Sequence, residues 1–225
     1  MKVTDRFHRF LLLAGGSILL SMLFAALLIP KGTDVLWING NHNEFRDRFF
    51  SIITYGGDGK IFVPIIVILL FVRFSYSIVA IAAWAGHGLI CSVMKRIVFP
   101  TMLRPAGTLD NDLLHFVPGV DVHVNYSFPS GHTATAFCFA FLIALLFRRR
   151  AVFFLMITLA LIVGYSRIYL LQHFLVDVVA GAFIGSIVAL IVWFLFERYG
   201  KAEWLGRRLE IQVKRSSRTT RVLPR

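Results

Sequence analysis

The sequence predicts an all-α membrane protein, a bundle of six transmembrane helices, because of its composition and its long uncharged segments. Hydrophobic residues make up 57% of the 225 residues, whereas a soluble domain is about 45–50% apolar. Residues 11–29 include no charged residue, and residues 174–196 include only Asp177. A helix of either length crosses the ~30 Å hydrocarbon core of a bilayer. These two segments therefore exclude an ordinary soluble fold.

The first predicted span lies at about 10–29. It follows three cations, Lys2, Arg6 and Arg9, as the core of a signal peptide would. Its apolar run is longer than the ~7–15 residues of a signal-peptide core, and more spans follow. We therefore expect an uncleaved first helix.

The second predicted span lies at about 49–72. It is interrupted by the glycine-rich residues 55–60 and by Pro64, and only 61–72 is cleanly apolar. Its outer half is therefore expected to be amphipathic. Four further spans are predicted at about 75–93, 132–147, 151–168 and 174–196.

Short linkers at 73–74 and 148–150 predict antiparallel neighbouring helices. Six spans place both termini on one side, which would carry sixteen of the 24 Lys and Arg residues. Such a bias marks the cytoplasmic side, so the long loop at 94–131 is expected to face outward. The net charge of +12 thus reflects membrane topology, and nucleic-acid binding is not expected.

The chain is expected to divide into a membrane domain, residues 1–200, and a basic cytoplasmic tail, residues 201–225. Cations in the tail would be attracted to anionic headgroups, although a tail without a role is equally compatible with its composition. Cys91 and Cys138 lie inside apolar segments and are expected to be buried thiols.

The most informative polar segment contains His173 and Asp177. These two residues are four positions apart, so on a helix they share one face. The carboxylate can orient the imidazole, leaving one nitrogen as a nucleophile or base. Arg167 closes the preceding apolar segment, and its planar fork suits a phosphate. Taken singly, a structural His–Asp pair and an arginine reaching the membrane interface explain these residues as well.

Two other segments carry matching chemistry. In Pro129-Ser130-Gly131-His132, Ser130 is placed to cap a helix whose first turn can bind an anion. Gly131 would let the backbone approach that anion closely, and His132 would be a proton donor. Lys95 and Arg104 add two cations before Pro105. Jointly, the three segments supply a phosphate-binding site with a nucleophile and an acid.

These segments resemble the three signature motifs of the type 2 phosphatidic acid phosphatase family, which also includes vanadium haloperoxidases. The second motif matches in full as Pro129-Ser130-Gly131-His132, and the third matches at Ser166, Arg167, His173 and Asp177. The first departs, because eight residues separate Lys95 from Arg104 and the family's usual spacer is shorter. The assignment of Lys95 therefore stays open.

The resemblance implies a haloperoxidase-like helical core and a division of roles. His173 would attack phosphorus, Asp177 would orient it, and His132 would protonate the leaving oxygen and then activate water. Five residues would hold the phosphoryl oxygens: Lys95, Arg104, Ser130, Gly131 and Arg167. Because these groups supply the positive field, neither a metal nor another cofactor is expected.

We therefore expect a metal-independent lipid phosphatase, acting through a phosphohistidine at the outer face of a bacterial inner membrane. Candidate substrates are undecaprenyl diphosphate, phosphatidylglycerol phosphate, phosphatidic acid and lipid A, and phosphate transfer to another alcohol stays possible. The alternative is a transporter or proton relay using Arg167, His173 and Asp177, and a vanadate-dependent haloperoxidase is a third possibility. His115, Asp121 and His123 are expected to be solvated loop residues. The oligomeric state stays open.

Overall fold

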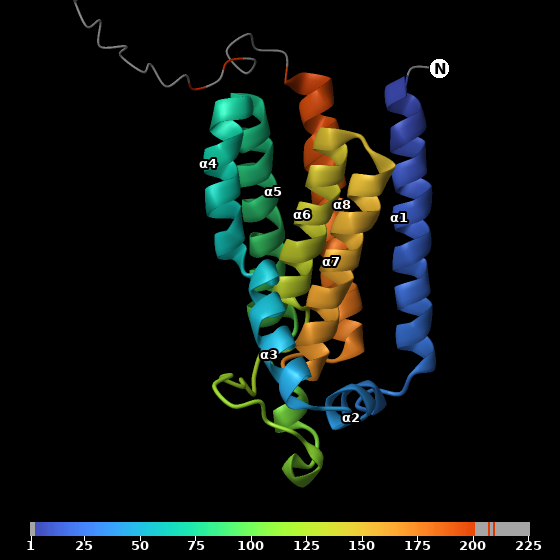
Figure 1. The fold of residues 1–225 in the computed structure, drawn as a ribbon, viewed down its shortest axis with the longest axis vertical. Coiled ribbons are helices and arrows are strands. Elements are labelled where there is room, and N and C mark those ends of the chain that lie inside the picture. Colours follow the sequence, from blue (N-terminus) through green and yellow to red (C-terminus); the bar gives the residue numbers. More distant parts are fainter. Residues whose placement is uncertain (1–2, 201–206, 208, 210–225) are drawn as a thin grey trace, which may run out of the picture.

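A computed structural model describes residues 3–200, 207 and 209 of the chain. This part is helical and contains no strand, as predicted (Figure 1). The α-helices are α1 (Val3–Leu28), α2 (Thr33–Gly40), α3 (Glu44–Ile53), α4 (Phe62–Val72), α5 (Phe74–Val93), α6 (Gly131–Phe147), α7 (Arg150–Tyr169) and α8 (Leu175–Tyr199). The tail predicted at 201–225 lies outside the described residues except for 207 and 209.

The start of α1 and the end of α8 lie at the same end of the bundle (Figure 1). The linkers from α4 to α5 and from α6 to α7 lie at that end too. At the opposite end lie α2, α3 and the long loop between α5 and α6. The sequence predicted this grouping of the short linkers with the ends of the membrane domain.

Four helices, α1, α5, α7 and α8, are long and apolar enough to cross a membrane. A fifth crossing is formed if α3 and α4 act as one span, although they are bent by 59° at the break between them. Helix α6 is apolar but has only 17 residues. By length and composition, the described residues therefore give four or five membrane helices where the sequence predicted six.

The break between α3 and α4 falls within the glycine-rich residues predicted to interrupt the second span. Two 3-10 turns occupy it, η1 (Thr54–Gly57) and η2 (Gly59–Ile61). Helix α3 begins earlier than predicted because Asn43 caps it, its side chain accepting a hydrogen bond from the backbone N–H of Arg46. Helix α2 was not predicted, because eight residues carry too little periodicity to mark a helix.

Helix α6 is the centre of the bundle, packed between α7, α8 and α5. Most of its side chains are buried, and a helix that is apolar on every face is expected in such a place. Its parallel neighbour α8 approaches it through Gly181 and Gly185. A Cβ at Gly181 would lie 2.3 Å from the carbonyl oxygen of Ser130. Small residues spaced by four permit this close helix packing in membranes.

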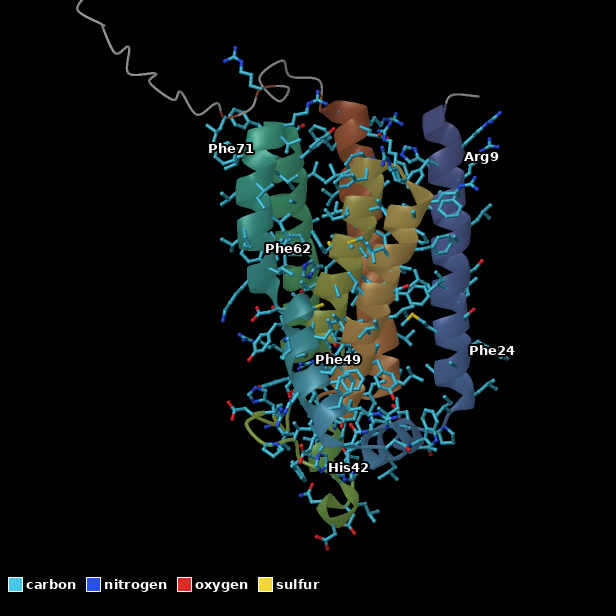
Figure 2. All side chains as sticks on the ribbon, in the orientation of Figure 1. Arg9, Phe24, His42, Phe49, Phe62 and Phe71 are labelled. Carbon is cyan, nitrogen blue, oxygen red and sulfur yellow. The ribbon has the colours of Figure 1, made fainter. Side chains whose placement is uncertain are left out.

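Large apolar side chains cover the outer surface of the bundle. Figure 2 shows Phe24 on α1 and Phe71 on α4 projecting away from the other helices, and they are 63% and 41% exposed. Such an extensive apolar surface indicates a lipid-facing exterior. Cys91 and Cys138 are both buried and free, as predicted. The chain is an integral membrane protein.

Candidate active site

The three polar segments meet at one cavity of about 450 Å³. It lies where α6 begins and α7 ends, on the side of the long loop. Six of the eight predicted site residues line it: Lys95, Arg104, Gly131, His132, Arg167 and His173. Ser130 and Asp177 stand behind this lining, and both are buried. The turn between α3 and α4 and residues 118–123 of the long loop complete the wall.

His173 occupies the tight turn between α7 and α8. Its side chain is 2% exposed, and its backbone N–H donates to the carbonyl oxygen of Arg167 at 3.1 Å. Burial, together with the charges of Arg104 and Lys95, holds the pKa of His173 well below its usual range. The ring is therefore neutral at pH 7, the form in which a nitrogen lone pair is available.

One carboxylate oxygen of Asp177, Oδ2, lies close to three neighbouring groups. It accepts hydrogen bonds from Ser127 Oγ at 2.5 Å and from the backbone N–H of Phe174 at 3.0 Å. It lies 3.5 Å from His173 Nδ1, which is longer than a good hydrogen bond. Asp177 therefore caps the start of α8 and faces Nδ1 of His173, so this contact leaves Nε2 of the ring free.

The second motif, residues 129–132, lies at the start of helix α6, and the first turn of this helix faces the cavity. Ser130 is its N-cap, with Oγ accepting from the backbone N–H of Thr133 at 3.4 Å and from its hydroxyl at 2.9 Å. The capping role predicted for Ser130 is thus present, but its side chain faces the helix and does not line the cavity. Gly131 and His132 do line it. The first-turn N–H groups of a helix favour an anion at this place.

Arg167 reaches the cavity from the last turn of α7 and is 7% exposed. Its Nη1 donates to Thr54 Oγ1 at 2.6 Å. Thr54 opens the turn η1, and Gly57 closes it against α6. A Cβ at Gly57 would lie 2.7 Å from the carbonyl oxygen of His132. The break in the second predicted span therefore forms one wall of the site.

Arg104 is held by two acceptors. Its Nε donates to the carbonyl oxygen of Asn125 at 2.9 Å, and its Nη1 donates to Gln172 Oε1 at 2.6 Å. Burial lowers its pKa, and the charge of Asp177 partly offsets this. A guanidinium stays protonated through such a shift. Arg104 therefore presents a fixed cation to the cavity.

Lys95 also reaches the cavity, although the first motif has a longer spacer. It lies in a π-helical turn, η3 (Met94–Val98), that follows α5. Its Nζ donates to the carbonyl oxygen of Tyr126 at 2.9 Å. A π-helical turn takes one residue more than an α-helical turn and is frequent at functional sites.

Sequence reasoning missed Thr54, Ser127 and Gln172. Each is buried, and each bonds a motif residue that is far away along the chain. Thr54 stands beside the glycine-rich break, and Gln172 directly precedes His173, which are the only local signals that either residue offers. Ser127 carries no local signal at all.

A second polar cluster lies beside the site at the ends of α2, α3 and α7. Asp47 accepts from Tyr169 Oη at 2.5 Å and lies 2.9 Å from His115 Nε2. The rings of His42 and His115 are stacked with centroids 3.8 Å apart. His115 is thus partly buried and bonded, contrary to the solvated loop residue expected, whereas Asp121 and His123 are exposed at the cavity. Among the described residues, no group of three or more His, Cys, Asp or Glu is arranged to hold a metal.

Comparisons with known proteins agree with this geometry. Residues 61–201 match the model of the PAP2 superfamily. The lipid A 4'-phosphatase of Bacteroides thetaiotaomicron is 29% identical over 72% of this chain and 74% of its own. The undecaprenyl-diphosphatase BcrC of Bacillus subtilis is 31% identical over 56% of this chain and 67% of its own.

Solved structures show the same fold. The crystal structure of Aquifex aeolicus LpxE has a TM-score of 0.63 and 28% identity, covering 71% of this chain and 92% of that one. A PAP2-type phosphatidylglycerolphosphate phosphatase from Bacillus subtilis has a TM-score of 0.62 and 21% identity, covering 88% and 98%. The enzymatic prediction and the family resemblance are confirmed. The chain belongs to the PAP2 superfamily and is a phosphatase embedded in the membrane.

Proposed function

We propose that this membrane phosphatase hydrolyses a lipid phosphate through a phosphohistidine on His173. The observation that carries the proposal is that His132 and His173 line one cavity together with three cations. Nucleophile, proton donor and charge stabilisation are the three functions that phosphate-ester hydrolysis requires.

In the first step, Nε2 of His173 attacks phosphorus, the N–P bond forms and the bond to the ester oxygen breaks. His132 gives its proton to the departing lipid oxygen. In the second step, His132 takes a proton from water, the resulting hydroxide attacks phosphorus and the N–P bond breaks. Inorganic phosphate leaves, and both histidines return to their starting forms.

The phosphoryl oxygens would be held by Lys95, Arg104 and Arg167, by the backbone of Gly131 and by the first turn of α6. Charge accumulates on these oxygens during phosphoryl transfer, so fixed cations stabilise the transition state. Ser130 would contribute by capping that turn, and Asp177 by orienting His173. A closely placed cation set of this kind performs the task that a metal ion performs in other phosphatases.

Among lipid phosphates, we propose a lipid A-type substrate first and undecaprenyl diphosphate second. Two supports favour this order. The lipid A 4'-phosphatases cover more of this chain than BcrC does. A second cavity of about 510 Å³ shares Ser51 and Pro118 with the first, so a headgroup larger than a phosphate has room beside the site.

We further propose that six segments cross the membrane, with α3 to α4 as one bent span and α6 as a short one. The cavity would then face the outside of a bacterial inner membrane, and both termini would be cytoplasmic. The supporting observation is the Lys and Arg bias toward the end where α1 starts and α8 ends. Single cysteines in the 148–150 linker and in the 118–123 loop, tested with an impermeant thiol reagent on intact cells, decide this orientation. If only the cysteine in the 148–150 linker were labelled, the protein would have the opposite orientation in the membrane.

The deciding experiment for activity is a phosphate-release assay on purified protein with four lipids: lipid A, undecaprenyl diphosphate, phosphatidylglycerol phosphate and phosphatidic acid. His173→Ala is the control and is expected to release no phosphate while staying folded in detergent. Normal turnover by this variant would refute His173 as the nucleophile, and a higher kcat/KM on any of the other three lipids than on lipid A would refute the substrate order.

A further inference from the structure

In the part of the chain that the structure describes, the three cations at the cavity are held by neutral acceptors. Lys95 bonds a backbone carbonyl, Arg104 bonds a carbonyl and the Gln172 amide, and Arg167 bonds the Thr54 hydroxyl. Within residues 3–200, none of the three forms an ion pair. This is unusual, because arginines are seldom buried unless their charge is paired.

Carboxylates are close by but are kept off these cations. Asp58 and Asp121 line the same cavity, yet neither pairs with a guanidinium among the described residues. A carboxylate on Arg104 or Arg167 would fix its direction and would also cancel its charge. A neutral acceptor fixes the direction and forms no ion pair, so it does not cancel the charge that an incoming phosphate would meet.

The side chain of Gln172 is held so that a neutral acceptor faces Arg104. It is 2% exposed, and its Nε2 donates to the carbonyl oxygen of Asp121 at 2.9 Å. Because a carbonyl oxygen accepts and cannot donate, this bond turns Oε1 of the amide toward Arg104. The backbone N–H of Gln172 also donates to the carbonyl oxygen of Arg167 at 2.9 Å. One residue thus connects Arg104, the loop and the turn that holds His173.

Thr54 does the same for Arg167 from the turn η1. It is 9% exposed, and η1, which it opens, lies against both α6 and α7. Among the residues that the structure describes, Nε of Arg167 has no hydrogen-bond partner, so the Thr54 hydroxyl is the side-chain contact that directs the guanidinium. The fork keeps unpaired N–H groups for phosphate oxygens.

We propose that Gln172 and Thr54 are positioning residues that direct Arg104 and Arg167 at the phosphate without forming an ion pair with either guanidinium. The proposal rests on the phosphate-binding roles proposed above for the two arginines. Phosphate binding by the two arginines does not by itself require neutral partners. The present proposal adds this requirement.

Gln172→Glu tests neutrality, because it keeps the size and the acceptor but adds a negative charge. At pH 7.5, the inhibition constant of vanadate is expected to rise about 10- to 100-fold, the size of one charged hydrogen bond. A vanadate inhibition constant that stays at the wild-type value overturns the proposal for Gln172.

Thr54 offers an independent test that does not depend on the fate of the Gln172 variant. Thr54→Val removes the hydroxyl at constant shape and is expected to raise the vanadate inhibition constant about tenfold, whereas Thr54→Ser restores it. Thr135→Val is the matched control, because Thr135 is also buried and bonds only the carbonyl oxygen of Gly131 among the described residues. Equal inhibition of the Val and Ser variants overturns the proposal for Thr54.

Arg104→Gln, measured in parallel, separates this inference from the function on which it rests. If Arg104→Gln binds vanadate as tightly as the wild type, the proposed phosphate site itself is wrong. If Arg104→Gln binds vanadate weakly and Gln172→Glu binds it normally, only the neutral-partner inference fails.

Discussion

Gly185 of α8 packs directly on the backbone of Ala134 in α6. A Cβ built at Gly185 would lie 2.1 Å from the carbonyl oxygen of Ala134 and 2.8 Å from the backbone nitrogen of Cys138. Since both helices begin at the cavity, this contact helps to fix the separation of His132, at the start of α6, from the turn that holds His173. The distance between the two proposed catalytic histidines thus depends on a helix contact inside the membrane.

Gly185→Ala is therefore expected to destabilise the protein by about 1–3 kcal/mol, the usual cost of overpacking a core. Activity is expected to fall as well, because the overlap is with backbone atoms and α8 must move away. The measurements are the thermal midpoint in detergent and kcat/KM. The matched control is Gly88→Ala on α5, where a Cβ meets nothing within 4 Å. Equal midpoints for the two variants would contradict the close packing of α6 and α8.

The pH dependence of activity should report the low pKa of His173. In the proposed mechanism the neutral ring attacks phosphorus, so a lowered pKa of His173 would let activity persist as the pH falls through the usual imidazole range near 6.5. Burial and the charge of Arg104 are the two largest causes of this shift. Arg104→Gln removes the second cause, so the pKa rises and the neutral form is lost at a higher pH.

The acid limb of kcat/KM, which reports the free enzyme, is thus expected to move to higher pH in Arg104→Gln, beyond any loss of rate. Arg96→Gln is the control, because Arg96 is exposed and does not line the cavity. An unchanged acid limb in Arg104→Gln would show that this arginine does not act on the nucleophile.

Ser127 is expected to act through Asp177. Ser127→Ala removes a donor that lies 2.5 Å from the carboxylate and should lower kcat about tenfold, the size of one hydrogen bond to a charged group. Asp177→Asn should lower it about 100-fold or more, because the orientation of His173 is lost. In the double variant, Ser127→Ala should add almost nothing. Additive losses in kcat would place Ser127 outside this chain of contacts.

Much of the fold followed from local patterns. The long uncharged segments marked α1, α5, α7 and α8, and the polar residues 55–60 marked the break between α3 and α4. His173 and Asp177 could be paired because their spacing of four is a property of the helix itself. The count of six crossings was less secure, since α6 begins inside the bundle at Ser130 and is therefore short.

The supporting residues of the site could not be predicted in this way. Thr54 meets Arg167 across 113 positions, and Gln172 meets Arg104 across 68. No periodicity links residues so far apart, because the contact depends on how α7 and the loop pack. The motifs therefore revealed the charged groups that would touch a phosphate, whereas the neutral groups that direct them required the tertiary structure.

Activity is expected to survive a metal chelator. Three cations and the first turn of α6 surround the cavity, so the positive field for a phosphate is supplied by the chain. After treatment with EDTA, phosphate release should stay within about twofold of the untreated rate, a change in barrier below ~0.5 kcal/mol. Vanadate should compete with the lipid substrate. A complete loss restored by Mg²⁺ would contradict this source of charge.

Lys95→Ala is expected to reduce kcat/KM less than Arg104→Ala. The Lys95 ammonium is a point charge that donates one described hydrogen bond, to the carbonyl oxygen of Tyr126. The Arg104 guanidinium is fixed at Nε and Nη1 and can bind two oxygens at once. Losses of about 10-fold and about 100-fold are expected, the scale of removing transition-state donors. Arg96→Ala, in the same turn as Lys95 but exposed, should retain the wild-type rate. A larger loss for Lys95→Ala would mean that the π-turn directs the main phosphate contact, and an unchanged rate would remove Lys95 from the site.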